Sequence, residues 1–392
     1  MLRARLGVVL AIAGLLAATA RAEDVSVLDD RPFVAALDRA LDRMYDLDLE
    51  GAARSFRELA AGRPGHPIGP LLEAEILWWR IQLDPLSTAH DDRFLERIET
   101  AVRKAEARLK RDRRDVDARF ALAAGYALRA RLRSLRRDWI TAAWDSKRAL
   151  NQVLTLRELR PHDPDLNLGL GLYDHLADAA PERYPVLRAL RPFFPDGDRE
   201  RGLARLHRAK RSSKISRTEA AFFLLQIEYF FEARYLPALE EARWLRARHP
   251  DNSVFHLFEG RIYSRWRQCA TADRIFREVL AKRRDGAFGY GDHQAEVAHF
   301  HRARCALLDG RPVDALRHAD AAEALAERRH STFHSSAHLH RGMAYDLQGE
   351  RSRALVQYHR ALVRRDMGTT HERARRFLEQ PFEGGGEDGG EE

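Results

Sequence analysis

Small, apolar and aromatic residues recur along this chain at the spacing of paired helices. The clearest run consists of Gly342, Tyr345, Gly349, Ala354, Tyr358 and Ala361. Small residues let two antiparallel helices approach closely, and aromatic side chains fill the seam between neighbouring hairpins. The segment therefore predicts a helical hairpin that turns at Gly349.

The same spacing is found upstream of this segment. All six positions are matched, with alanine in place of the aromatic residues, by Ala303, Ala306, Gly310, Ala315, Ala319 and Ala322. Phe276 follows Gly260 at the same interval as Tyr358 follows Gly342. From Gln226 to Gly260 the pattern advances by one period of about 34 residues, the length typical of stacked helical hairpins. The next two intervals, to Ala303 and then to Gly342, are longer and indicate loop insertions.

The N-terminal part carries a weaker form of the pattern. Ala40 and Ala74 are again one such period apart, and Ala52 and Phe56 keep the spacing of a second helix. Between positions 90 and 160 the pattern predicts helices longer than the consensus, over 115–135 and 138–159.

These matches resemble the tetratricopeptide repeat (TPR) family over residues 30–378, with the best motifs in 218–365. The resemblance implies an all-α fold: a right-handed superhelical solenoid of antiparallel helical hairpins, about seven in number. We divide the chain into a signal peptide (1–22), degenerate hairpins (23–165), an interrupted repeat (166–217), a C-terminal array (218–380) and a disordered acidic tail (381–392).

The interrupted repeat bears a second resemblance. Gly169-Leu-Gly-Leu-Tyr173, Pro185-Val-Leu-Arg-Ala-Leu190 and Gly197-Asp-Arg-Glu-Arg-Gly-Leu203 are similar to the inclusion-body clearance family of TPR-containing proteins. That family has no clear catalytic activity to transfer. The insert 178–198 is rich in proline and aromatic residues, so we expect it either to bind a partner or to cover an exposed helix face.

The N-terminus of the chain indicates export. Arg3 and Arg5 precede an apolar stretch, and Ala20-Arg21-Ala22 has the form of a cleavage site. This is the pattern of a secretory signal peptide, although a retained N-terminal anchor is the alternative. No later stretch is apolar for long enough to span a membrane, so we expect the mature chain not to be membrane-spanning. The periplasm of a bacterium is the predicted location, with secretion as an alternative.

The charge is unevenly distributed along the chain. The formal net charge is +8, with three arginines in the signal and five acids in the tail, so the body between them is close to +10. Of the 67 basic residues only six are lysine. Carboxylates commonly lie three or four residues from an arginine, which we interpret as solvated helical faces. Because export separates the chain from the chromosome and RNA, we expect no nucleic-acid partner.

Cys269 and Cys305 are the only cysteines. An exported chain allows one disulfide between them, and two small buried thiols are the alternative. The pattern leaves this pairing open.

Histidines are the residues that most suggest a metal or a catalytic site. Ten of the 17 lie between His293 and His371, and Ala298-His-Phe-His-Arg302 recurs as Ala337-His-Leu-His-Arg341. Equivalent positions on stacked helices are roughly 8–10 Å apart, too far for one ion to join them. The chain has no H-E-x-x-H, P-loop or G-x-S-x-G motif. We therefore expect no enzyme, no metal and no cofactor, and an envelope metal protein or enzyme that uses these histidines is the alternative.

A protein-binding surface is the function that the repeat favours. In TPR proteins the first helix of each hairpin lines a concave groove, and spacing predicts the residues that project there. They are Phe223, Ile227, Phe230, Phe231, Leu257, Arg261, Arg265, Phe300, Arg304, Leu339 and Met343. An apolar strip edged with arginine suits a protein or peptide segment that carries acidic groups. We expect a scaffold or adaptor of the cell envelope; the alternatives are core packing of these phenylalanines and a carrier for an apolar ligand.

Overall fold

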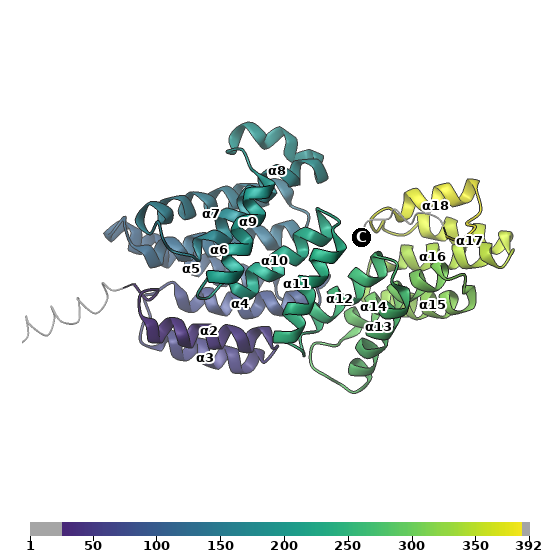
Figure 1. Ribbon diagram of the computed structural model, residues 1–392, viewed down its shortest axis with the longest axis horizontal. Coiled ribbons are helices and arrows are strands. Elements are labelled where there is room, and N and C mark those ends of the chain that lie inside the picture. The colour runs from purple at the N-terminus through teal and green to yellow at the C-terminus, as the bar shows by residue number, and fades with distance from the viewer. Residues whose placement is uncertain (1–25, 386–392) are drawn as a thin grey trace, which may run out of the picture. The chain divides into compact units, whose positions relative to one another are not determined.

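The computed structural model describes residues 26–385 (Figure 1). The predicted signal peptide and residues 386–392 of the predicted tail lie outside the described residues. Within them the chain forms helices and no strand, and none of these helices is both long and apolar enough to cross a membrane. The predicted all-α class is confirmed.

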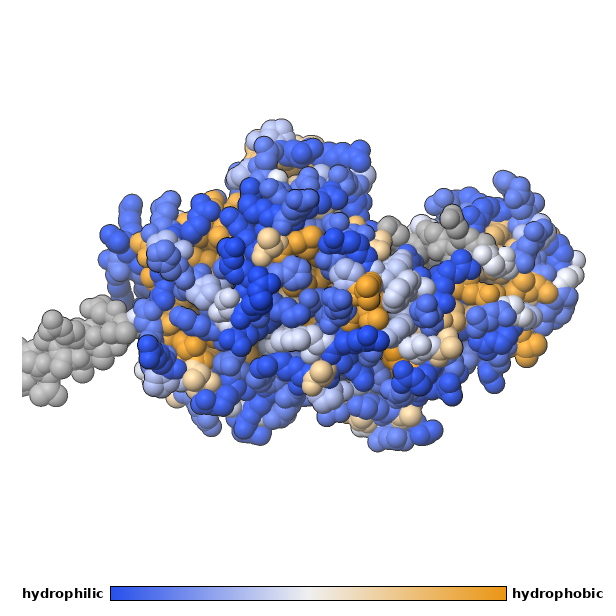
Figure 2. Space-filling view, viewed as in Figure 1, coloured by the Kyte–Doolittle hydropathy of each residue, from blue (hydrophilic) through white to orange (hydrophobic). Residues whose placement is uncertain are grey.

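The chain divides into two compact units. Unit 1 comprises the described chain up to Met44, Asp48–Trp79 and Ala89–Ala220, and unit 2 comprises Tyr45–Leu47, Arg80–Thr88 and the chain from Ala221 onward. The face shown in Figure 2 is mostly hydrophilic, with separate apolar patches.

The elements follow one another as helices joined by short turns. The first nine are α2 (Arg31–Tyr45), α3 (Leu49–Ala61), α4 (Ile68–Leu83), α5 (Asp91–Arg111), α6 (Val116–Leu135), α7 (Trp139–Leu159), α8 (Leu166–Arg183), the 3₁₀-helix η1 (Pro185–Phe193) and α9 (Arg199–Ser212). They are followed by α10 (Arg217–Phe230), α11 (Tyr235–Arg248), α12 (Ser253–Arg265), α13 (Cys269–Arg284), α14 (Asp292–Leu308), α15 (Pro312–Arg329), α16 (Phe333–Leu347), α17 (Arg351–Leu362) and α18 (Thr370–Glu379). Helices α6 and α7 match the predicted long helices. Their N-termini are capped by Asp115 and Asp138, whose side chains accept the backbone N–H groups of Ala118 and Thr141.

Consecutive helices pack against each other within each unit. In unit 1 each of α5 to α8 contacts the helix that follows it, and in unit 2 the same holds from α11 to α17. The first helices of successive hairpins in unit 2 also touch, α12 with α14 and α14 with α16. The predicted arrangement of consecutive helical hairpins is confirmed.

The turns inside these hairpins share one backbone conformation. A left-handed residue with φ between 51° and 75° is found at Leu47, Arg137, Ala233, Arg267, Gly310 and Gly349. After the last three, the next residue donates its N–H to a carbonyl five residues earlier, at 2.8–2.9 Å. This is the bond of a Schellman motif, which satisfies a carbonyl at a helix C-terminus. These three turns repeat at the intervals that separate Gly260, Ala303 and Gly342, so the predicted register of the C-terminal repeats is confirmed.

Two of the helix seams of unit 2 match a glycine to an aromatic residue. A Cβ on Gly260 would lie 2.7 Å from Cε1 of Phe276, and a Cβ on Gly342 would overlap the ring of the fully buried Tyr358. In the intervening hairpin the corresponding residues, Ala303 and Ala319, are both small and buried. At each of these seams the residue on the first helix is small, which permits the predicted close approach of the helices.

Several carboxylates lie between helices and not on solvated faces, so our interpretation of them from spacing is wrong for these residues. Asp145 of α7 is fully buried and accepts from Nε and Nη2 of Arg129 on α6, at 2.8 and 2.7 Å, and from Arg133. The hydrogen bond to Asp145 raises the pKa of Arg129. Asp174 of α8 is bound in the same way by Arg201 of α9, at 2.7 Å. Spacing along one helix does not show partners that reach across a hairpin.

The chain is still packed beyond the start of the predicted tail at position 381. Phe382 is buried against Phe377, with ring centroids 5.4 Å apart, and donates its N–H to Asp346 at 2.9 Å.

We predict opposite effects for the same glycine-to-alanine change at two positions. Gly342→Ala places a methyl group against Tyr358 and should lower the free energy of unfolding by about 1–3 kcal/mol. Gly62→Ala is the control, because Gly62 has φ −81° and open space around its Cβ position. It should raise the free energy of unfolding by about 0.4–1 kcal/mol. Urea titrations measure both, and a Gly342→Ala protein as stable as the wild type would contradict the seam argument.

Candidate functional site

The eleven predicted binding residues lie on or directly after the first helices of four consecutive hairpins in unit 2. Phe223, Ile227 and Phe230 are on α10, with Phe231 directly after it. The others are Leu257, Arg261 and Arg265 on α12, Phe300 and Arg304 on α14, and Leu339 and Met343 on α16.

An aromatic cluster joins α10 to α12. The ring of Phe230 lies 4.8 Å from Tyr229 and 5.9 Å from Phe258, both in edge-to-face geometry. The guanidinium carbon of Arg261 lies 5.0 Å from the centroid of Phe258 and 5.4 Å from each of the other two rings. A cation over several ring faces is stabilised by their quadrupoles. Two predicted residues, Phe230 and Arg261, therefore meet in one cluster.

Exposure separates the predicted residues into two groups. Six are buried, namely Ile227, Leu257, Phe300, Arg304, Leu339 and Met343. Five remain partly exposed, namely Phe223, Phe230, Phe231, Arg261 and Arg265. Helical spacing shows which residues share a face, but it does not show how much of that face the next hairpin covers. The accessible part of the predicted surface therefore lies on α10 and α12.

Arg304 has a structural role inside unit 2. It donates through Nη1 to the carbonyl oxygen of Ser264, near the C-terminal end of α12, where helix carbonyls have no partner within the helix. His301, one turn before on the same helix, contacts Oγ of Ser264 through Nδ1 at 3.0 Å. Arg304 thus ties α14 to the end of α12.

The two cysteines are buried free thiols in neighbouring helices. A hydrogen bond between the thiols lowers the pKa of Cys269 and raises the pKa of Cys305. The disulfide that the sequence left open is not formed here.

One histidine of each repeated motif, His299 or His338, lies in the seam between the two helices of its hairpin. The other, His301 or His340, stacks on a phenylalanine of the preceding hairpin. Nδ1 of His299 is 3.1 Å from Nδ1 of His318, and Nδ1 of His338 is 2.9 Å from Oε1 of Gln357. Burial lowers the pKa of His299 to about 4 and that of His318 to about 3, so both rings are neutral at pH 7. Residues 26–385 contain no group of three or more His, Cys, Asp or Glu arranged to hold a metal ion.

Sequence reasoning missed a buried carboxylate in the first turns of α14. Glu296 is fully buried, and Ser331 and Arg329 both donate to it, while Arg329 also binds Asp84 at 2.5 Å. Burial raises the pKa of Glu296 to about 7. The available signal was an acid between Ala295 and Val297, in a helix whose residues are mostly apolar.

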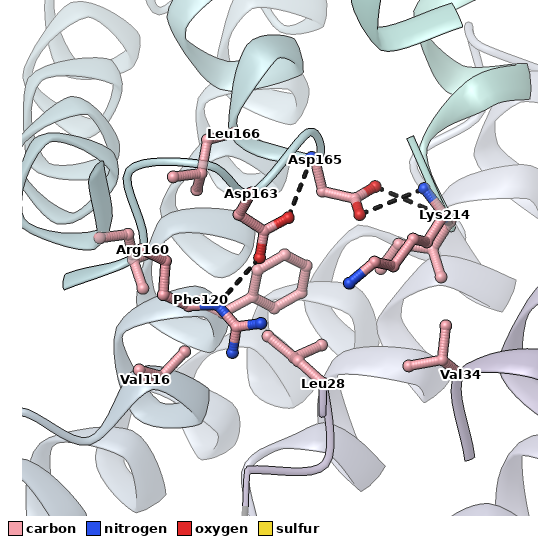
Figure 3. Close-up of a pocket in the computed structure, with 11 residues that line it drawn as sticks. Leu28, Val34, Val116, Phe120, Arg160, Asp163, Asp165, Leu166 and Lys214 are labelled. Carbon is pink, nitrogen blue, oxygen red and sulfur yellow. Dashed lines mark hydrogen bonds and ion pairs between the residues drawn. The ribbon is translucent and has the colours of Figure 1, made fainter. Parts of the chain in front are cut away.

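A small pocket lies in unit 1, between the loop after α7 and the loop after α9 (Figure 3). Nε of Arg160 contacts Asp163 at 3.0 Å, and Asp165 accepts the backbone N–H groups of Lys214 and Ile215 at 3.2 Å. The pocket has a volume of about 20 Å³, which is room for one water molecule. It is too small for a cofactor or a lipid chain, since ligand pockets measure roughly 300–1,000 Å³.

Comparisons with solved structures find likenesses, of which three are described here. No protein-family model matches the chain, and no curated protein sequence matches it. The human IFIT1 dimer with PPP-AAAA is 15% identical at a TM-score of 0.41, covering 80% of this chain and 68% of that chain. The TPR domain of P58(IPK) is 14% identical at a TM-score of 0.27, covering 89% and 97%. The human IFIT1 dimer with m7Gppp-AAAA is 14% identical at a TM-score of 0.34, covering 90% and 88%.

Structural similarity at these TM-scores does not show what the chain binds. The resemblance of residues 169–203 to the inclusion-body clearance family stays a prediction.

The histidine seam generates a prediction about pH. The folded chain keeps His299 and His318 neutral, whereas the unfolded chain protonates them near pH 6.5, so unfolding takes up protons and stability falls as the pH drops from about 6.5 towards 4. His318→Gln recreates the seam of His338 and Gln357. It should change the free energy of unfolding at pH 7 by about 1 kcal/mol or less. It should also reduce the loss of stability that occurs between pH 7 and pH 5.

The control for this change is His359→Gln, because His359 is exposed within the helix α17. It should leave the pH dependence of urea unfolding as in the wild type. An equal pH dependence for His318→Gln and the wild type would contradict the assignment.

Proposed function

We propose that this chain is a non-catalytic scaffold that binds a segment of a partner protein along the first helices of its unit 2 hairpins. The observation that carries the proposal is the stacking of helical hairpins in one register. It aligns α12, α14 and α16 side by side and leaves aromatic and arginine side chains partly exposed at α10 and α12. Such arrays offer extended surfaces to other proteins.

The chemistry of the accessible residues supports a partner segment that is both apolar and acidic. Phe223 and Phe231 offer aromatic area, which contributes strongly to binding when it is covered. Arg265, which is partly exposed, places a positive charge beside these rings and attracts acidic groups of a partner. The buried Arg304 is not part of this proposal, because it is used inside the unit.

We also propose that the chain acts in a bacterial cell envelope, most simply the periplasm. The proposal rests on the N-terminal charge, the apolar stretch and the cleavage site up to Ala22. That the chain is not an enzyme stays a prediction.

Export predicts a defined mature N-terminus. When the full gene is expressed in a bacterium that processes signal peptides, the periplasmic fraction should contain a protein that begins at Glu23. Fractionation followed by N-terminal sequencing measures this. A variant with Ala20 and Ala22 both changed to Gln is the control and should remain unprocessed. Recovery of the intact N-terminus from the cytoplasm would contradict the proposal.

The binding surface predicts a specific loss of affinity. A photo-crosslinking residue at position 265 should capture the partner in intact cells, and Phe231→Ser with Arg265→Glu should then weaken binding of the purified partner tenfold or more, about 1.4 kcal/mol. Leu236→Ser with Arg277→Glu is the matched control, because both residues are exposed and lie on the second helices α11 and α13. Equal affinities for the two double variants would contradict the placement of the site.

A further inference from the structure

The Pro/aromatic insert forms an ordered projection from unit 1. In Figure 1 the chain between α8 and α9 extends away from the other helices of this unit, and none of the residues of η1 is buried. A 3₁₀-helix has three residues per turn, so positions three apart form stripes. Leu187 and Leu190 form the half-buried stripe, while Arg188 and Arg191 form an exposed one. Arg188 also donates through Nε to the carbonyl of Pro181 at 3.1 Å.

Contacts at both ends hold this projection in place. The ring of Tyr184 stacks on Trp139 of α7, with centroids 4.1 Å apart. At the other end Tyr173 of α8 donates its hydroxyl to the carbonyl of Pro195 at 2.7 Å. The segment is therefore presented as a fixed surface, and ordering it on binding costs little.

Large apolar side chains gather on the outside of the projection and on the adjoining part of α7. Val186 is 47% exposed, Phe193 54%, Ile140 50% and Trp144 37%. The rings of Trp144 and Phe193 are 6.0 Å apart, so they belong to one surface. We name Ile140, Trp144, Val186, Arg188, Arg191 and Phe193 the projecting patch.

The charge on the projection itself is positive, with the exposed Asp196 directly after it. Residues 184–195 contain two arginines and no acid. Lys147 of α7 lies 5.2 Å from the ring centroid of Trp144. The nearest acids on α8, Asp178 and Glu182, are both bound by Arg199.

We propose that the projecting patch docks on a bilayer surface that carries anionic lipid headgroups. Aromatic and aliphatic side chains would enter the boundary between headgroups and acyl chains, while Arg188, Arg191 and Lys147 contact lipid phosphates. A peptide partner is less suited to this site, because peptides are bound in grooves or at sheet edges, and this surface projects. The proposal concerns unit 1 and is independent of the protein-binding surface proposed in unit 2.

Vesicle binding tests the proposal with the full chain. The wild type should co-sediment with vesicles of equal parts phosphatidylglycerol and phosphatidylcholine, and not with phosphatidylcholine alone. Arg188→Glu with Arg191→Glu should lower the partition coefficient about 30-fold or more, from about 1 kcal/mol for each arginine lost near the surface. Val186→Ser with Phe193→Ser should lower it about tenfold or more, because apolar burial is lost. The tryptophan emission should shift to shorter wavelength on binding, and the shift should be reduced in Trp144→Phe, because the chain has six tryptophans.

Two matched controls separate the patch from the general basicity of the chain. Arg360→Glu with Arg375→Glu makes the same change in net charge at exposed positions of α17 and α18. Val313→Ser with Val363→Ser removes two exposed apolar side chains from unit 2. Both double variants should bind vesicles as the wild type does, and circular dichroism should show that all four are folded.

Three outcomes would overturn the proposal. The first is absent or equal binding of the wild type to the two kinds of vesicle. The second is an equal loss in the patch variants and the controls, which would indicate non-specific charge attraction. The third is self-association of the wild type in sedimentation velocity that the patch variants abolish while vesicle binding persists. It would make the patch a contact between copies of the chain.

Discussion

The packing of both units depends on ion pairs between neighbouring helices. In each pair, arginine binds a carboxylate that is buried between the helices. Asp145 in unit 1 and Glu296 in unit 2 are fully buried, and each is bound by an arginine of an adjacent helix. A buried carboxylate without its cation costs several kcal/mol, so a hairpin can close only in the register that joins the two. The planar guanidinium binds both carboxylate oxygens at once, as Arg129 does at Asp145, and a lysine ammonium does not reproduce that geometry. Arg129, Arg133 and Arg329 are therefore used inside the hairpins.

Side-chain volume at the seams sets how closely the helices approach. Successive hairpins keep the same arrangement with different residue pairs at the seam. A glycine lies opposite an aromatic ring at Gly342 and Tyr358, and an alanine lies opposite an alanine at Ala303 and Ala319. A left-handed turn residue follows the first helix of these hairpins. At Arg267 and Ala233 this residue is not glycine, so the conformation has a steric cost there. Because the same turn and the same kind of helix seam recur in successive hairpins, the first helices of these hairpins lie side by side. A continuous binding surface requires this alignment.

The two surfaces proposed for binding differ in how they arise. The strip on α10 and α12 is what remains exposed after the hairpins of unit 2 have covered the rest of their first helices, and Arg261 lies over its aromatic rings. The projecting patch of unit 1 comes from an insertion between two paired helices, held at its ends by Tyr173 and Tyr184. One surface belongs to the repeat and the other interrupts it.

The sequence by itself determined the helical class, the repeat register and the long helices α6 and α7, because small residues, turn positions and caps act between neighbours in the chain. It did not determine which of the eleven predicted binding residues stay accessible. Leu339 and Phe223 occupy equivalent positions of the repeat, three residues before Gly342 and Gln226, yet Leu339 is packed within its unit while Phe223 is only half-buried. It also did not show that Asp145 and Glu296 are buried. Coverage of a helix face and pairing across a seam depend on residues tens of positions away, and only the tertiary structure brings those together.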